Sequence, residues 1–164
     1  MLDLLGAVLV LVFFLPIGLL LIAAIRCSRS GPIFARDETA GLRGRVFGRW
    51  RLHQPERETV FDRVLWLAGL ADLPSAVNVI DGDMSLIGPR PRSPAQHAYL
   101  GQGRPDYGRR FQARPGMIWP RAIEGEPSWS AELDYIDQWS VFVDLKVAGL
   151  YATQGLFREE QGVD

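Results

Sequence analysis

The residues best suited to chemistry gather between Ala71 and Pro91. This stretch holds three carboxylates, Asp72, Asp81 and Asp83, and it ends with an arginine enclosed by two prolines, Arg90. Proline fixes its own φ and favours extended backbone in the residue before it, so a stiff chain aims the Arg90 guanidinium. A guanidinium suits bidentate capture of phosphate or carboxylate. The stretch predicts an anion site, and its alternative is a surface turn with an ordinary ion pair.

Helices and a hairpin are expected to position this stretch. Apolar residues at helical spacing predict an amphipathic helix over 60–70, and Pro74 suits the first turn of a second helix over 73–80. Further upstream, residues 33–36 and 45–50 read as two short strands joined by a turn at 40–44. The arginines of this hairpin form a basic cluster that would be attracted to anionic lipid.

The downstream part is expected to be irregular and then helical. Residues 92–114 are rich in Arg, Gly and Pro and predict an exposed connection with one short helix over 94–100. From Ser130, a good N-cap, apolar residues recur every three or four positions to Leu150. Aromatic residues such as Trp139 favour a helix lying at a membrane interface, and a plain core-facing helix is the alternative.

The N-terminal stretch Leu4–Ile25 carries no charge and, at about 1.5 Å per residue, is long enough to cross a hydrocarbon core of about 30 Å. Pro16 would kink or break this helix. One interpretation is a kinked span, with Arg26 and Arg29 on the cytoplasmic side. The other is a re-entrant hairpin that enters and leaves the same leaflet.

Composition excludes several classes of site. The net charge is −1, so global charge indicates no particular partner and no nucleic acid. Cys27 is the single cysteine, which rules out a disulfide within the chain and a metal site built on thiolates. The sequence carries no Walker phosphate loop, no dinucleotide fingerprint and no serine elbow.

The order of the segments resembles a known family. A membrane segment broken by proline is followed by Gly31-Pro32-Ile33-Phe34, Asp72-Leu73-Pro74, the stretch from Gly82 to Pro91, Arg114-Pro115-Gly116, and Trp139-Ser140 with Asp144-Leu145-Lys146. The chain resembles the bacterial sugar transferase family, the small monotopic phosphoglycosyl transferases, from about Leu2 to Leu156. The segment from Gly82 to Pro91 is the most specific part of this resemblance.

The resemblance implies a mixed α/β fold that is mainly α. Residues 1–27 would form a membrane-embedded helix, with the re-entrant form now favoured over the span. Residues 28–164 would form a cytoplasmic domain of helices with a short β-hairpin and interfacial amphipathic helices. The protein would lie at the bacterial inner membrane in contact with lipid, with its main domain on the cytoplasmic side.

The resemblance also implies a reaction. Family members transfer a sugar-1-phosphate from a nucleotide sugar, usually a UDP-sugar, to polyprenyl phosphate, which starts lipid-linked glycan and exopolysaccharide assembly. A neighbouring Asp-Glu pair carries the chemistry: the Asp attacks phosphorus and the Glu helps to hold Mg²⁺. On this basis Arg90, Arg114 and Asp83 are the expected substrate or phosphate ligands.

The chain departs from the family pattern at the reacting positions. Ala71 occupies the position of the nucleophile, and Asp72 occupies the metal-binding position and is left as the candidate catalytic and metal-binding residue. Trp66 stands where an arginine is usual, residues 51–53 replace a Lys-Phe-Arg, and Ile118-Trp119 replace a Thr-Gly.

Two functional hypotheses follow from these departures. In the first, the chain is a working transferase, in which Asp72 serves as nucleophile or the lipid phosphate attacks directly. In the second, it is an inactive family member that acts as a membrane-bound binding or scaffolding partner in a complex with another glycan-assembly protein.

Overall fold

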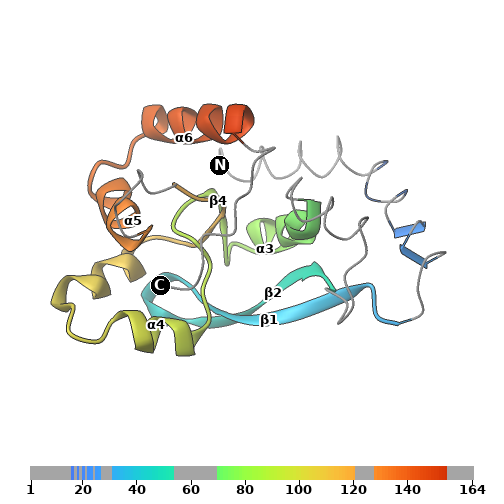
Figure 1. Ribbon diagram of the computed structural model, residues 1–164, viewed down its shortest axis with the longest axis horizontal. Coiled ribbons are helices and arrows are strands. Elements are labelled where there is room, and N and C mark those ends of the chain that lie inside the picture. The colour runs from blue at the N-terminus through green and yellow to red at the C-terminus, as the bar shows by residue number, and fades with distance from the viewer. Residues whose placement is uncertain are drawn as a thin grey trace.

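The computed structural model describes residues 31–53, 70–120 and 128–154, together with seven residues of an N-terminal helix between Pro16 and Arg26. Figure 1 shows a long β-hairpin along the lower edge of the molecule, with most of the helices above it. The described part is therefore a small mixed α/β fold with two separate two-stranded sheets. This agrees with the α/β class expected from the sequence.

The hairpin confirms the prediction made from the sequence, with longer strands than expected. Strand β1 spans Phe34–Ala40 and strand β2 spans Val46–Leu52, and they pair antiparallel with Phe34 opposite Leu52 and Ala40 opposite Val46. The short 3-10 turn η1, Leu42–Gly44, joins them. Its last residue, Gly44, has φ of 74°, a left-handed conformation that glycine adopts without strain.

A helical segment lies against the hairpin and begins differently from the prediction. The expected helix over 73–80 is a 3-10 helix, η2 (Leu70–Ser75), followed by a short α-helix, α3 (Ala76–Ile80). Pro74 lies inside η2 rather than starting an α-helix. The buried Asn78 side chain binds β2 by accepting from the Trp50 N–H at 2.9 Å and donating to the Gly48 carbonyl at 3.0 Å. The Ser75 hydroxyl donates to the Trp50 carbonyl at 2.8 Å, so η2 and α3 are fixed to the hairpin.

A second, parallel strand pair was not expected from the sequence. Strand β3 (Ser85–Ile87) pairs with β4 (Gly116–Ile118), so two segments about thirty residues apart run side by side. At their ends the backbones of Gly88 and Gly116 nearly touch, because a Cβ on Gly116 would lie 2.2 Å from the Gly88 nitrogen. Only glycine fits such an approach. The buried Met84 packs with Val79 below this pair, where Phe47, Leu86 and Met117 also contribute.

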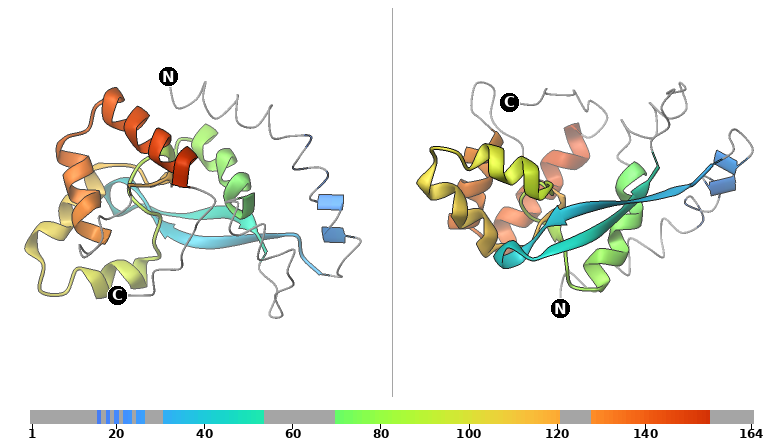
Figure 2. Two further views of the ribbon diagram at one scale, coloured as in Figure 1. Left: turned by 45° about the horizontal axis from the view of Figure 1, so that its top comes forward. Right: turned by 90° about the horizontal axis from the view of Figure 1, so that it is seen from below.

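The region between β3 and β4 is less exposed than predicted. Helix α4, Pro94–Leu100, has the predicted bounds and begins with a capping box between Ser93 and Gln96. The prediction of an exposed connection is wrong for η3, a 3-10 helix over Pro105–Gln112, because it buries Tyr107 and Arg110. Helix α4 appears below the sheet in Figure 2, on the side away from α6.

The C-terminal helical pattern forms two helices instead of one. Helix α5 spans Ser128–Asp137, two residues earlier than the predicted N-cap, and α6 spans Val141–Gln154. The chain leaves the helical conformation between them, and the Ser140 hydroxyl accepts from the Val143 N–H, which caps α6. Helix α5 buries Leu133 and Tyr135, whereas the side chains of α6 include several exposed apolar residues. The core-facing interpretation is confirmed for α5, and the interfacial position of the later helix stays a prediction.

The N-terminal helix lies mostly outside the described residues. Those described between Pro16 and Arg26 are helical, and Ile25 is buried against Leu52 at the end of the hairpin. Of the helices within the described part of the chain, none has the length and apolar character needed to cross a membrane. The predicted helix over 60–70 lies outside the described residues.

Candidate active site

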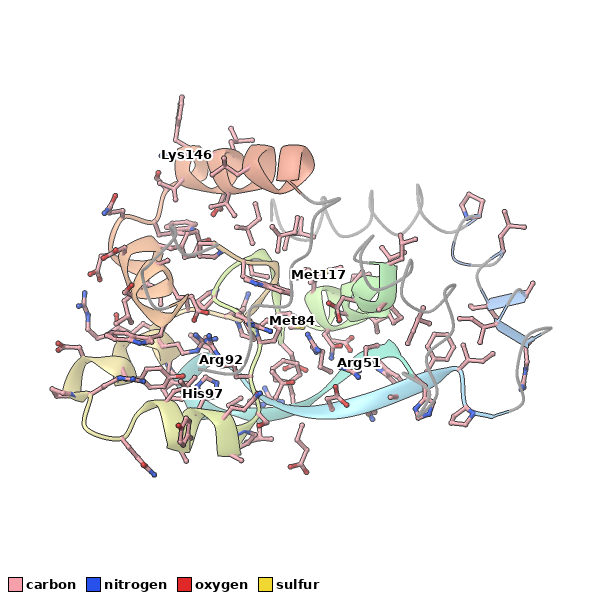
Figure 3. The ribbon with its side chains drawn as sticks, in the orientation of Figure 1. Arg51, Met84, Arg92, His97, Met117 and Lys146 are labelled. Atoms are coloured by element: carbon pink, nitrogen blue, oxygen red, sulfur yellow. The ribbon has the colours of Figure 1, made fainter. Side chains whose placement is uncertain are left out.

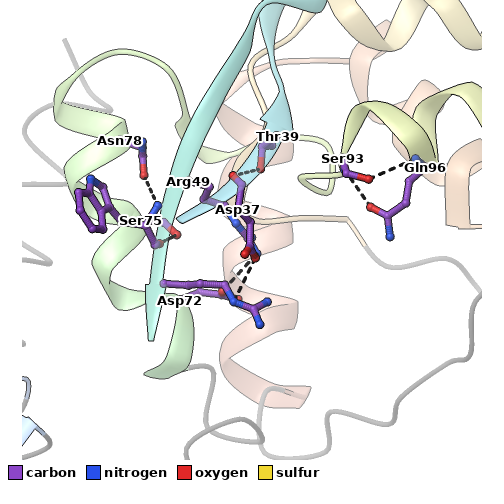
Figure 4. Close-up of polar contacts among 10 residues, drawn as sticks. Asp37, Thr39, Arg49, Asp72, Ser75, Asn78, Ser93 and Gln96 are labelled. Carbon is purple, nitrogen blue, oxygen red and sulfur yellow. Dashed lines mark hydrogen bonds and ion pairs between the residues drawn. The ribbon is translucent and has the colours of Figure 1, made fainter. Parts of the chain in front are cut away.

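The altered carboxylate pair lies on η2, beside the hairpin. The Ala71 methyl is buried, and the Asp72 side chain is 17% exposed. The two neighbours therefore face different surroundings, the interior for residue 71 and a partly open surface for residue 72. Asp72 faces Arg49 on β2, at 3.7 Å from a carboxylate oxygen to Nη2 (Figure 4).

Arg49 connects Asp72 to a second carboxylate. The same Nη2 atom lies 4.0 Å from an oxygen of Asp37 on β1, and Arg51 binds that oxygen at 3.1 Å through Nε. We call these four residues the hairpin ion network. Within the described residues, the buried Nε of Arg49 makes no hydrogen bond, which leaves a donor pointing at no acceptor. The two arginines and two carboxylates balance in charge, and Asp37 is the most exposed of the four.

The predicted anion residue Arg90 lies at the other end of the stretch. Its side chain is exposed and its guanidinium carbon lies 5.7 Å from the centre of the Trp119 ring, a cation–π contact. Hydrogen bonds hold the backbone on both sides: the Gly116 N–H donates to the Pro89 carbonyl at 2.9 Å, and the Ala40 N–H donates to the Arg92 carbonyl at 3.0 Å. The prediction that stiff backbone aims this arginine is consistent with these contacts.

A buried ion cluster lies behind Arg90. Glu132 on α5 accepts from Arg92 at 2.7 Å and also contacts Arg110 on η3, and all three side chains are at least nine-tenths buried. Arg110 donates a further hydrogen bond to the Arg90 carbonyl. We call Arg92, Glu132 and Arg110 the buried ion cluster; Figure 3 labels Arg92, next to His97. Sequence reasoning missed this cluster, because nothing in the spacing of 92, 110 and 132 pairs them.

Two pKa shifts accompany the cluster. Burial, with a contribution from the charge of Arg92, lowers the pKa of Arg110 to about 9, so the guanidinium remains a cation at pH 7. Burial lowers the pKa of His97 to about 4, and the charges of Arg110 and Arg92 add to this. His97 is therefore neutral at pH 7, and its Nδ1 lies 2.9 Å from the Tyr107 hydroxyl.

The remaining predicted residues are divided between the two ends. Arg114 is exposed, and its carbonyl lies 2.5 Å from where a Cβ on Gly88 would stand, so it is close to the backbone before Arg90. Asp83 is partly buried after the Gly82 turn, and its N–H donates to the Asn78 carbonyl at 3.0 Å. The structure thus brings Arg114 and Arg90 to the β3–β4 junction, while Asp72 lies with the hairpin.

The carboxylates near the site are few. In the part of the chain that the structure describes, no group of three or more His, Cys, Asp or Glu side chains could hold a metal ion. Mg²⁺ in phosphate-transfer sites is commonly held by one or two carboxylates plus the phosphates of the substrate. Asp72 can supply one such ligand, so the residues present fit a metal that arrives with a phosphorylated substrate.

Comparison with known proteins assigns the chain to a family. The family model described as bacterial sugar transferase matches residues 1–157. The chain belongs to the bacterial sugar transferase family. The match includes both the segment from Gly82 to Pro91 and the position of Ala71.

The chain is similar to individual sugar transferases and to an exopolysaccharide production protein. A UDP-glucose:undecaprenyl-phosphate glucose-1-phosphate transferase from Caulobacter vibrioides is 32% identical, with 89% of this chain and 65% of the relative covered. The uncharacterized sugar transferase EpsL from Bacillus subtilis is 30% identical over 96% of this chain and 86% of its own length. The exopolysaccharide production protein ExoY from Rhizobium meliloti is 26% identical over 88% of this chain. The chain thus spans slightly less than two thirds of the Caulobacter relative.

Proposed function

We propose that the chain transfers a sugar-1-phosphate from a nucleotide sugar, of the UDP class, to undecaprenyl or a related polyprenyl phosphate. The product would begin an exopolysaccharide or another lipid-linked glycan. The observation that carries the proposal is the preserved segment from Gly82 to Arg90, held in place within a chain that matches its family over residues 1–157. The name of the Caulobacter relative supports the choice of acceptor and donor, and that of ExoY supports the role in exopolysaccharide production.

Arg90 and Arg114 would bind the donor phosphates. Both side chains are exposed, and their backbones meet at the β3–β4 junction. A planar guanidinium can pair two phosphate oxygens at once, and developing charge on the transferred phosphoryl group is stabilised by such fixed cations. The Trp119 ring beside Arg90 would limit the directions that this guanidinium can take.

The altered dyad favours direct attack over a covalent intermediate. Successive side chains on a 3-10 helix point about 120° apart, since this helix has about three residues per turn. Asp72 on η2 therefore cannot place its carboxylate where an Asp at 71 would lie. In the direct route, a lipid phosphate oxygen bonds to the phosphorus next to the sugar, the bond from that phosphorus to the nucleotide breaks, and nucleoside monophosphate leaves with the electron pair.

Asp72 would then act on charge rather than as a nucleophile. With substrate bound, it is the residue that would hold Mg²⁺, which would neutralise phosphate charge. Arg49 faces the same carboxylate at 3.7 Å and keeps it oriented until substrate arrives. Asp83, behind the Gly82 turn, would help to fix the loop that carries Arg90.

The main domain would work at the cytoplasmic face of the bacterial inner membrane. Exposed apolar side chains of α6 support an interfacial position: Phe142 is 85% exposed, and Leu145 and Leu150 are also exposed. Trp139 lies just before this helix and is exposed as well, and tryptophan is enriched at membrane interfaces.

One observation favours a second candidate function. The buried methyl of Ala71 offers no atom for nucleophilic attack at the position that the family uses. A chain that keeps the anion residues and lacks turnover would bind nucleotide sugar or lipid phosphate and serve as a partner for another glycan-assembly protein.

A release assay separates the two candidates. Purified chain in detergent, with Mg²⁺, polyprenyl phosphate and a panel of UDP-sugars, is expected to release UMP only when lipid phosphate is present. Asp72→Asn should reduce release by about 10²-fold, the order of loss on removing one group that stabilises the charge of the transition state. Absence of release above the Asp72→Asn level would contradict transfer and favour the binding role.

Restoring the dyad sharpens the same assay. The double variant Ala71→Asp with Asp72→Glu is expected to trap labelled phosphosugar on the protein before lipid is added, whereas the unaltered chain should trap none. Labelling of the unaltered chain at Asp72 would contradict direct attack. Silence of the double variant would indicate that further changed positions, such as Trp66 and Trp119, also limit the reaction.

A further inference from the structure

We infer that Arg110 and Glu132 are positioning residues for the anion site, acting through the main-chain carbonyl of Arg90. Arg110 donates to that carbonyl and Glu132 binds Arg110 from behind. The inference rests on the proposed function, in which the Arg90 guanidinium binds the donor phosphates.

The backbone around Arg90 needs partners from outside its own segment. Pro89 and Pro91 have no N–H, so this stretch cannot form a regular strand ladder with both neighbours. Its carbonyls are instead satisfied by three different elements: β4 through Gly116, η3 through Arg110, and β1 through Ala40. The bonds from Gly116 and Ala40 come from main chain, whereas the bond at Arg90 comes from a side chain and can be removed by one substitution.

Arg110 is built into the interior rather than offered to a ligand. It is 4% exposed and Glu132 is 1% exposed, so the two charges cannot be reached by a substrate without unfolding the region. A guanidinium has donors in a fixed planar fork, and here one part faces the carboxylate and another faces the Arg90 carbonyl. Glu132 thus fixes the direction of the Arg110 guanidinium, and this guanidinium in turn holds the backbone of Arg90, whose own guanidinium is exposed.

The chain supplies a matched control between the same two elements. Arg109 on η3 forms an ion pair with Asp137 on α5, and each of these side chains is 43% exposed. This surface pair joins η3 to α5 as the buried pair does, but its arginine faces solvent. A substitution at Arg109 therefore measures the loss of an η3–α5 link without loss of the bond to Arg90.

The test measures binding of UDP-glucose and of inorganic pyrophosphate to the full chain in detergent, by titration calorimetry. Arg110→Lys keeps the charge beside Glu132, so the chain should fold, but a single ammonium cannot reproduce the fork. We expect it to weaken binding by about tenfold, the loss that follows from one hydrogen bond involving a charged group. Arg109→Lys should change binding by less than about twofold, since an exposed pair contributes little.

A double variant shows whether Arg110 acts through Arg90. Arg90→Gln should weaken binding at least as much as Arg110→Lys does, and adding Arg110→Lys to Arg90→Gln should change binding by less than about twofold, because the two act as one unit. Glu132→Gln should resemble Arg110→Lys, and thermal melting of each variant confirms that it is folded. A purely structural role would weaken binding equally in both backgrounds.

The outcomes separate this inference from the proposed function. Weaker binding with Arg90→Gln but unchanged binding with a folded Arg110→Lys would overturn the positioning role and leave the function intact. The expected binding pattern without any UMP release would support the positioning role and overturn transfer. Failure of the unaltered chain to bind either probe would overturn both.

Discussion

The molecule carries two arginine–carboxylate networks that differ in how far they are buried. The buried ion cluster joins α5, η3 and the segment after Arg90, and its three side chains are at least nine-tenths buried. The hairpin ion network joins β1, β2 and η2 with separations of 3.1 to 4.0 Å, and its Asp37 side chain is 42% exposed. The first network is closed to solvent, whereas the second reaches the surface through Asp37.

The difference shows how the site divides its work. Charges that are buried and paired are expensive to uncouple, so the buried ion cluster can fix a backbone position permanently. In the hairpin ion network only Asp37 is well exposed, and exposed ion pairs contribute little to stability, so its contacts with Arg49 and Arg51 can be lost at small cost. The segment around Arg90 is therefore held by buried charges, whereas the Asp37 side of the hairpin ion network is held weakly.

The largest expected effect is at the centre of the buried ion cluster. Glu132→Ala would leave the buried arginines Arg92 and Arg110 without their carboxylate, and we expect the free energy of unfolding to fall by about 3–5 kcal/mol. Chemical unfolding of the full chain in detergent measures it. The control Asp137→Ala at the exposed pair should cost no more than about 1 kcal/mol. Equal losses in the two variants would remove the contrast between buried and exposed pairs.

A smaller effect is expected from pH, through His97. Its pKa is about 4 in the folded chain, against about 6.5 when unfolded, so the unfolded state binds the extra proton between these values. At pH 7 the lowered pKa of His97 does not affect the free energy of unfolding. As pH drops from about 6.5 to about 4, that free energy falls by about 3 kcal/mol in total. The free energy of unfolding, measured at several pH values in this range, should change less with pH for His97→Gln than for the unaltered chain. An identical slope in both would contradict the shift.

The smallest expected effect is in the hairpin ion network. Asp37→Asn removes the negative charge that Arg49 and Arg51 share at Asp37. Because Asp37 is partly exposed, the free energy of unfolding should fall by less than about 1 kcal/mol. Freed from Asp37, the two arginines should bind pyrophosphate more tightly, which calorimetry would measure. A fall of several kcal/mol in the free energy of unfolding would mean that the hairpin ion network stabilises the fold as strongly as the buried ion cluster does.

Local patterns predicted the parts of the fold that depend on local rules. The hairpin over 34–52 followed from short apolar runs around a turn, and α4 followed from Pro94 after a capping serine. The parallel pairing of β3 with β4 could not be predicted, since three-residue strands carry too little pattern and their register depends on the distant approach of Gly88 to Gly116.

The site was predictable to the same degree. The two prolines beside Arg90 predict a stiff backbone, and hydrogen bonds from Gly116 and Ala40 hold the same segment in the structure. The partner of Asp72 did not follow from spacing, because Arg49 lies on β2, about twenty residues earlier in the sequence, and meets Asp72 only through packing. Burial of Arg110 could not be predicted either, because neighbouring arginines normally indicate a solvated face. Arg110 is buried because Glu132, distant in the sequence, supplies a carboxylate inside the fold.

The contact of Gly88 with Gly116 has a mechanical consequence. With no side chain between them, the two backbones have no layer that can slide or compress, so the loop bearing Arg90 and the strand leading to Trp119 should move as one rigid piece. Any opening that admits a bulky donor must then hinge elsewhere. Gly82, with φ of 80°, stands at the turn before this piece, where the backbone takes a left-handed conformation that glycine adopts without strain.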